Sequence, residues 1–236
     1  MTTGGGDVRR PAVPAPFLIK ICGITTAEDA AAAVAAGAGA IGVNLWPRSK
    51  RYVDDAAAAR VLAAIPPGVL RFGVFVNAPA GEVEARMAAL GLDRAQLHGD
   101  EQPASFAHVA GGRLMRVVRV RDASSFAEMA PWHADLFLFD SFVDGYGGAG
   151  VAAPWADIAR AAPRDRPFLL GGGLDPDNVA AAIAATRPAG VDVASGVERA
   201  PGVKDRARLI AFIAAAREAA AQAAAVDARG PATAGR

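Results

Sequence analysis

The sequence predicts an α/β protein in which eight parallel strands, each followed by a helix, close into a single barrel. Short aliphatic runs alternate along most of the chain with stretches that have helical spacing. The runs are apolar almost throughout, as expected of parallel strands that are covered on both faces. The length of 236 residues is close to that of one eight-fold β/α barrel. Together these observations favour a (β/α)8 barrel, the TIM-barrel architecture.

In the first half of the chain, aliphatic or β-branched runs predict strands, and alanine-rich stretches predict helices. Turn residues end the first three helices: Gly37, then Pro66-Pro67-Gly68, then Gly91. The fourth strand is short and its helix is weak, so a six-stranded doubly wound open sheet stays as the alternative. The expected strands are 17–21, 40–45, 70–76 and 94–97, and the expected helices are 27–36, 54–65, 81–90 and 103–110.

The second half repeats the alternation. Gly111-Gly112 separates the fourth helix from the fifth strand, and Pro188 precedes the last strand. The barrel domain should span residues 17–219, with a disordered leader at 1–16 and a disordered tail at 220–236. The expected strands are 114–120, 136–139, 168–170 and 191–193, and the expected helices are 124–130, 154–162, 176–186 and 203–219.

Composition excludes several classes of function. The formal net charge is +1, from 25 basic and 24 acidic side chains that are well mixed, so neither nucleic acid nor a membrane is expected as a partner. The uncharged stretch 30–47 approaches the length of a membrane span, but its glycines and Asn44 favour a helix, a turn and a strand. One cysteine cannot form an internal disulfide, which predicts a reducing, cytoplasmic location.

Two chemically active side chains end buried strands. The first strand leads directly to Cys22, and the sixth, Leu136-Phe-Leu-Phe, leads to Asp140. Barrel enzymes keep their chemistry at the carboxyl ends of the strands. Strand alternation also places Lys20 on the same face as Cys22, where its charge could favour the thiolate; a lysine paired with a neighbouring carboxylate is the alternative. The pattern predicts an acid/base pair formed by the thiol and the carboxyl group.

Glycines after the seventh and eighth strands predict a phosphate site. Gly172 and Gly173 precede an expected helix start, and Ser195 and Gly196 offer a hydroxyl group and bare backbone from the next loop. Barrels often bind phosphate between these two loops through backbone N–H groups.

The segment Gly145-Tyr-Gly-Gly-Ala-Gly150 matches the spacing of a dinucleotide-binding motif. Its glycines begin well past the strand end, and no acidic residue follows at the position that would bind a ribose. We therefore interpret the segment, which includes Gly148 and Gly150, as a flexible loop that closes over a ligand.

Two further residues at strand ends are candidates for substrate contacts. Arg51, beside Tyr52, could hold a carboxylate through its planar guanidinium group. His98 is the only histidine at a strand end, and it fits equally well as a ligand-positioning or a structural residue. Three histidines without ligand spacing predict no metal, and no nicotinamide is expected.

Seven segments, in order, closely resemble one enzyme family. They are Leu-Ile-Lys-Ile-Cys-Gly23, Pro-Arg-Ser-Lys-Arg-Tyr52, Phe-Gly-Val-Phe-Val-Asn77, Gln-Leu-His-Gly-Asp-Glu101, Gly-Gly-Ala-Gly150, Gly-Gly-Gly-Leu174 and Asp-Val-Ala-Ser-Gly-Val-Glu198. The chain resembles phosphoribosylanthranilate isomerases of tryptophan biosynthesis over about residues 18–215. Gly171 and Ala194 depart from the residues that are commoner in that family, and both keep the site small.

The resemblance implies an Amadori rearrangement of a phosphoribosyl aminoaldose to a 1-amino-2-ketose. It implies that Asp140 is the general acid, that Cys22 is the base and that Arg51 binds the anthranilate carboxylate. It assigns the phosphate to the loops after the sixth to eighth strands, and it implies no cofactor. A monomer and a homodimer are both compatible with the sequence.

Two other functions remain as alternatives. A different phosphosugar enzyme, such as an epimerase or aldolase, would require metal-ligating histidines or a Schiff-base lysine, for which only Lys20 qualifies. A barrel without catalytic activity would bind phosphosugars and leave them unchanged.

Overall fold

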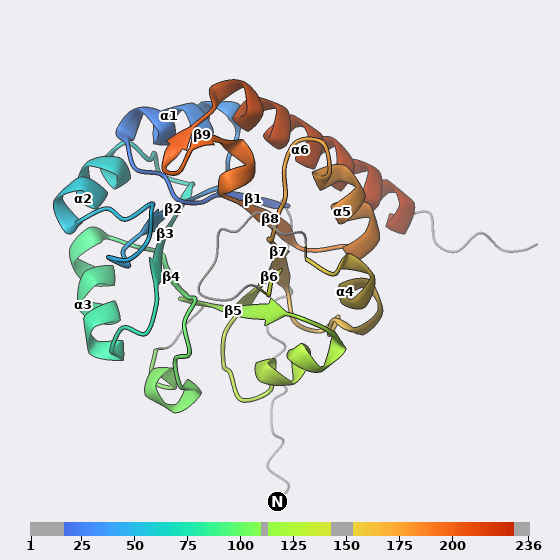
Figure 1. The fold of residues 1–236 in the computed structure, drawn as a ribbon, viewed down its shortest axis with the longest axis horizontal. Helices are drawn as coiled ribbons and strands as arrows, with labels where there is room; N and C mark the ends of the chain where they lie inside the picture. The colour runs from blue at the N-terminus through green and yellow to red at the C-terminus, as the bar shows by residue number, and fades with distance from the viewer. Residues whose placement is uncertain (1–16, 110–112, 143–152, 229–236) are drawn as a thin grey trace, which may run out of the picture.

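The computed structural model describes residues 17–109, 113–142 and 153–228, and it forms a closed barrel of eight parallel strands (Figure 1). Each strand pairs with the next along the chain, and β1 pairs with β8 to close the cylinder. The predicted (β/α)8 barrel is confirmed, and the open-sheet alternative is wrong. The strands are β1 (Leu18–Ile21), β2 (Ala40–Asn44), β3 (Leu70–Phe75), β4 (Arg94–Leu97), β5 (Leu114–Val120), β6 (Leu136–Ser141), β7 (Phe168–Leu170) and β8 (Gly190–Val193).

Helices surround the barrel, and local signals explain where the first of them begins and ends. The side chain of Thr26 caps the N-terminus of the first helix by accepting a bond from the Asp29 N–H, and Gly37 ends this helix with φ 106°. The α-helices are α1 (Ala27–Ala36), α2 (Asp55–Ala63), α3 (Ala80–Leu90), α4 (Trp155–Ala161), α5 (Val179–Thr186) and α6 (Arg206–Ala228).

Two predicted helices take a tighter form. The segments after β4 and β5 are the 3-10 helices η1 (Pro103–Phe106) and η2 (Ala123–Met129). Proline stands at the start of η1, and Asp122 and Ser125 form a capping box at the start of η2, so both segments begin with helix-start signals. Both segments still bury aromatic side chains, Phe106 and Phe126, against the barrel.

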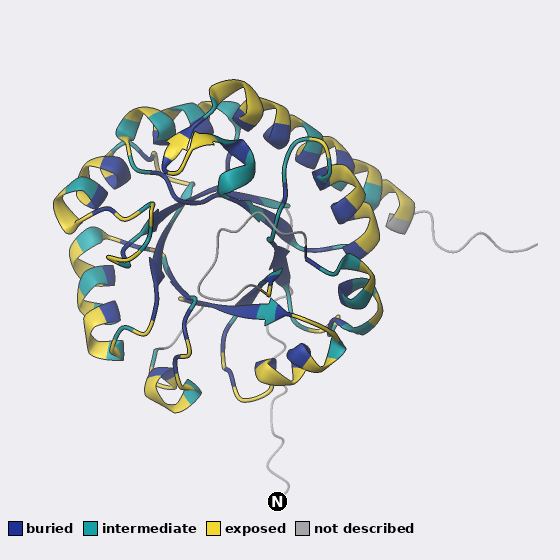
Figure 2. Ribbon diagram, viewed as in Figure 1, coloured by how far each residue is buried: buried dark blue, intermediate teal, exposed yellow. Residues whose placement is uncertain are grey.

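The core has two parts, one inside the barrel and one between the barrel and its helices. Figure 2 shows the strands largely buried and the helices with buried and exposed segments. The interior is filled from alternate positions of the strands, as expected where every second side chain points inward. These interior residues are Ala40, Phe72, Met115, Val117, Leu136, Leu138 and Leu169. These apolar side chains fill the inside of the barrel below the carboxyl ends of the strands.

The C-terminal segment differs from the predicted helix 203–219. A hairpin of β9 (Glu198–Ala200) and β10 (Val203–Lys204) follows the short turn η3 (Ser195–Val197), so the helix begins only at Arg206. It then continues past residue 219, as a helix, to Ala228. By length and composition α6 could cross a membrane. Its apolar side chains Leu209, Phe212 and Ile213 are instead buried against the barrel, as in the core helix of a globular protein.

Replacing Phe212 with alanine should lower the free energy of unfolding by about 3–5 kcal/mol, because the side chain is fully buried between α6 and the barrel. Ile210→Ala on the exposed side of the same helix is the matched control and should cost less than about 1 kcal/mol. Denaturant titration measures both, and equal losses would contradict the packing described for α6.

Candidate active site

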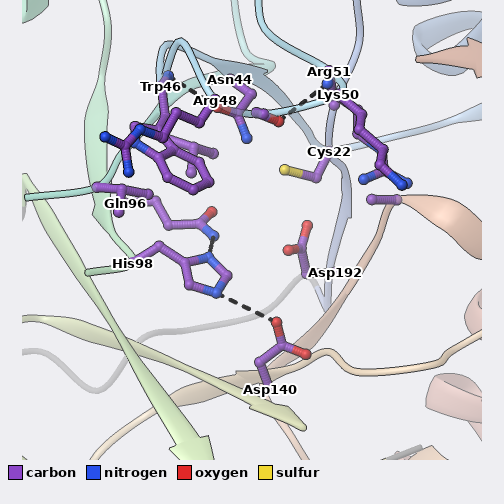
Figure 3. Close-up of a pocket in the computed structure, with 15 residues that line it drawn as sticks. Cys22, Asn44, Trp46, Arg48, Lys50, Arg51, Gln96, His98, Asp140 and Asp192 are labelled. Atoms are coloured by element: carbon purple, nitrogen blue, oxygen red, sulfur yellow. Dashed lines mark hydrogen bonds and ion pairs between the residues drawn. The ribbon is translucent and has the colours of Figure 1, made fainter. Parts of the chain in front are cut away.

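A cavity of about 370 Å³ opens at the carboxyl ends of the strands (Figure 3). Cys22 and Asp140, the predicted acid/base pair, both line it, as do Arg51 and His98. The structure therefore brings together four predicted residues from distant parts of the sequence. Further residues that line the cavity are Asn44, Trp46, Gln96 and Asp192.

Cys22 follows β1 and points into the cavity (Figure 3). A side chain on Gly42 of the neighbouring strand would come within 3.0 Å of Sγ and 3.1 Å of Lys20 Nζ, so the glycine leaves space for both groups. Burial raises the pKa of the thiol above its ordinary value, whereas the nearby Lys20 ammonium acts in the opposite direction. Lys20 thus favours the thiolate, but burial outweighs it. Lys20 is also paired with the Asp192 carboxylate at 2.8 Å, as in the alternative interpretation of this lysine.

Asp140 lies at the end of β6 with its carboxyl group largely buried. Burial raises its pKa to about 6, although the Ser141 N–H donates a 2.8 Å hydrogen bond to Oδ1 and favours the ionised form. The negative charge of Asp192 raises this pKa further, and Lys20 lowers it. A carboxyl group that exchanges its proton near neutral pH is suited to general acid catalysis.

His98 faces Asp140 across the cavity, with 3.6 Å between Nε2 and Oδ2 (Figure 3). Burial and nearby cations lower the pKa of His98 to about 3, so the imidazole is neutral and the contact is not an ion pair. The Gln96 amide nitrogen lies 3.3 Å from Nδ1. Since this nitrogen donates, Nδ1 accepts and Nε2 carries the proton that points toward Asp140. Nε2 is buried and makes no direct hydrogen bond within the described protein.

Arg51 is held by a chain of buried charges. Its Nε and Nη2 donate to the two oxygens of Glu198 at 2.8 and 2.7 Å. Lys204 donates to the same carboxylate at 2.9 Å and to the carbonyl oxygens of Cys22 and Ala194 at 2.7 and 3.0 Å. Lys204 therefore links the ends of β1 and β8 to the carboxylate that orients Arg51.

A second, smaller cavity of about 50 Å³ adjoins the first between the loops after β7 and β8. Gly172, Gly173 and Ser195, three of the residues predicted for a phosphate site, line it. Gly172 has φ 78°, and a side chain there would approach the Ser141 nitrogen to 2.6 Å. Gly196 has a packing role, because a side chain there would collide with the Leu174 carbonyl oxygen.

Gly148 and Gly150 lie outside the described residues, and so does the predicted closing loop.

Sequence analysis missed Asp192 and the roles of Glu198 and Lys204. Asp192 lies within a short apolar strand and not at its end. Only strand alternation, which places Asp192 and Ala194 on the same inward face, could have indicated it. Lys204 was assigned to a helix that begins two residues later. Among the described residues, no three His, Cys, Asp or Glu side chains are grouped as metal ligands.

The closed barrel, with a thiol and a carboxyl group in one cavity and a glycine-lined cavity beside it, is the arrangement of a (β/α)8-barrel enzyme. The family model of N-(5'-phosphoribosyl)anthranilate (PRA) isomerase matches residues 19–215. The chain therefore belongs to the N-(5'-phosphoribosyl)anthranilate isomerase family, a family of isomerases in tryptophan biosynthesis.

Relatives and solved structures agree with this assignment. An N-(5'-phosphoribosyl)anthranilate isomerase of Magnetococcus marinus is 44% identical over 202 residues, which cover 85% of this chain and 95% of that protein. The phosphoribosyl anthranilate isomerase of Thermotoga maritima is 36% identical, with a TM-score of 0.80 over 86% of this chain and all of that one. Another structure of such an isomerase, with reduced 1-(o-carboxyphenylamino)-1-deoxyribulose 5-phosphate bound, is 35% identical, with a TM-score of 0.77 over 86% of this chain and 100% of that one.

Asp140→Asn should stabilise the protein at neutral pH. The raised pKa, about 6 against an ordinary 3.8, means that ionising Asp140 costs the folded state more than the unfolded state. Asparagine removes a cost of about 2–3 kcal/mol and keeps an oxygen for the Ser141 N–H.

Urea unfolding across pH measures this difference, which should be largest above pH 6 and vanish below the ordinary pKa of the carboxyl group. Asp157→Asn, at a more exposed carboxylate on α4, is the control and should show no such gain. A destabilised Asp140→Asn at pH 8 would argue against the buried carboxylate described here.

Proposed function

We propose that Cys22 and Asp140 are the base and acid with which this enzyme converts N-(5'-phosphoribosyl)anthranilate to 1-(2-carboxyphenylamino)-1-deoxyribulose 5-phosphate. One observation carries the assignment: the only thiol of the chain and a carboxyl group that titrates near neutral pH line the same cavity. The relatives are named for this isomerisation, and one is bound to a reduced form of the product.

The reaction requires one proton donor and one proton acceptor. Asp140 donates its proton to the furanose ring oxygen, the C1–O bond breaks, and the nitrogen lone pair forms an iminium. The thiolate of Cys22 removes the proton from C2, and the electron pair moves to give an enol-amine. Tautomerisation of the enol-amine gives the ketone, so atoms and charge balance without a redox partner. Positioned acid and base groups typically contribute about 10²- to 10⁴-fold each.

The resting protonation states are the reverse of those that start the reaction. With a pKa near 6, Asp140 is about one-tenth protonated at pH 7, and burial keeps Cys22 mostly as the thiol. Moving one proton from the thiol to the carboxylate within the cavity gives the active form. The fraction of active enzyme therefore depends on the difference between the two pKa values.

Substrate binding is assigned to the groups around this pair. Arg51 would hold the anthranilate carboxylate, since Glu198 fixes its guanidinium plane at the rim of the cavity. His98 offers its Nε2 proton to Asp140 or to the substrate. The small cavity beside Gly172, Gly173 and Ser195 would take the phosphate, with Gly148, Gly150 and Gly196 kept as predicted contributors. The proposal also includes a cytoplasmic location and either a monomeric or a homodimeric state.

Cys22→Ala should lower kcat by at least about 10²-fold while the enzyme still binds product, because the base is lost but the binding groups remain. Asp140→Asn should behave in the same way. The decrease in phosphoribosylanthranilate fluorescence measures turnover, and product titration measures affinity. Unchanged turnover in either variant would remove that residue from the proposed mechanism, and an inactive wild-type protein that binds the substrate would support a binding barrel instead.

Arg51→Lys should raise KM about 10- to 100-fold with a smaller effect on kcat, because lysine cannot reproduce the paired hydrogen bonds of a guanidinium group. Arg48→Lys, in the same loop and also lining the cavity, is the matched control. A substrate analogue that lacks the carboxylate should bind wild type and Arg51→Lys equally. If the analogue still discriminates between them, Arg51 contacts another part of the substrate.

A further inference from the structure

We propose that Lys20 and Asp192 are positioning residues whose buried ion pair adjusts the balance of protonation between Cys22 and Asp140. This inference deepens the proposed function by assigning a device that controls the acid and the base together. Neither residue has to contact the substrate to act in this way.

The geometry places the pair beside both reacting groups. Lys20 and Asp192 are direct register partners across the β1–β8 pairing that closes the barrel. Nζ and Oδ1 are 2.8 Å apart, and the side chain of Lys20 is fully buried. Lys20 is two residues before Cys22 on the same strand face, and its ammonium and the sulfur share the space over Gly42. Asp192 lines both cavities together with Asp140.

The two charges act in opposite directions on the same two groups. Lys20 lowers the pKa of Cys22 and of Asp140, and Asp192 raises both. Lys20 influences the thiol more strongly, since it lies beside the thiol and is the smallest of the causes at Asp140. Lys20 therefore reduces the difference between the pKa values of Cys22 and Asp140. A smaller difference favours the active form, in which Cys22 is a thiolate and Asp140 is protonated.

Other charged groups lie near Lys20, Asp192 and the two groups that they influence, and the test variants have to leave these charges unchanged. Around Cys22 these are Arg51 from the loop after β2, Glu198 from β9 and Lys204 from β10. His98 from β4 faces Asp140 and is neutral. Arg48 and Lys50 line the rim of the cavity. None of these bonds directly to Lys20, which donates to Asp192.

The test is the ionisation of the single cysteine, followed by thiolate absorbance in the substrate-free enzyme across pH. Lys20→Met should move thiol ionisation to higher pH by about one unit or more, and should lower kcat/KM at neutral pH about tenfold or more. Asp192→Asn should move thiol ionisation to lower pH and shift both limbs of the kcat/KM profile in the same direction. Lys20→Arg should restore ionisation close to that of wild type.

The double variant Lys20→Met/Asp192→Asn removes both charges and should return thiol ionisation toward wild type. Glu101→Gln breaks another buried ion pair, to Arg116, and is the control for loss of a buried charge partner. It should lower stability and leave thiol ionisation unchanged. If Lys20→Met does not fold, Asp192→Asn carries the test, because its shift has the opposite sign.

Shifts of the same sign in both single variants, or no shift in either, would overturn the inference. The thiol titration is made without substrate, so it stands even if Cys22 is not the base. Expected shifts in thiol ionisation combined with an unchanged rate profile would support the electrostatic pair and count against the proposed role of Cys22.

Discussion

The pairing of β1 with β8 is the constraint on which the site depends. It joins the first and last strands of the barrel, so residues about 170 positions apart in the sequence become direct neighbours. Lys20 and Asp192 meet across it, and Lys204 bonds to the carbonyl groups of Cys22 and Ala194 at the two strand ends. The strand pairing that closes the barrel therefore also brings together the groups that surround Cys22. Asp140 lies on β6, two strands from β8, and the regular progression of strands brings it to the same cavity.

Burial and charge oppose each other throughout this cavity. Removing a thiol and a carboxyl group from water favours their neutral forms, and on this ground both pKa values lie above their ordinary positions. For the carboxyl group this is useful, since an acid needs its proton. For the thiol it is a cost, since a base must lose one. The cations gathered on the Cys22 side, Lys20 and Lys204, offset this cost without removing it.

Strand and helix positions followed from sequence because apolar runs and glycine or proline turns are local signals. All eight strands lie within one or two residues of their predicted bounds, and the thiol and carboxyl group were found from their places at strand ends. The remaining features depend on tertiary partners. Glu198 was named only as the last residue of a segment shared with the family, because its role depends on its contacts with Arg51 and Lys204. The 3-10 form of η1 and η2 was also missed, because their start signals are those of any helix.

The bonds of Lys204 also bear on the order in which the molecule is completed. A chain emerging from the ribosome has Cys22 available early, but the ammonium group that binds its carbonyl oxygen is added only after all eight strands have been made. Arg51 likewise lacks its carboxylate partner until Glu198 arrives. A nascent or truncated barrel that ends before the β9–β10 hairpin would have its thiol present and its surroundings unfinished. The contacts that complete the surroundings of Cys22 and Arg51 therefore come from the last part of the chain to be made.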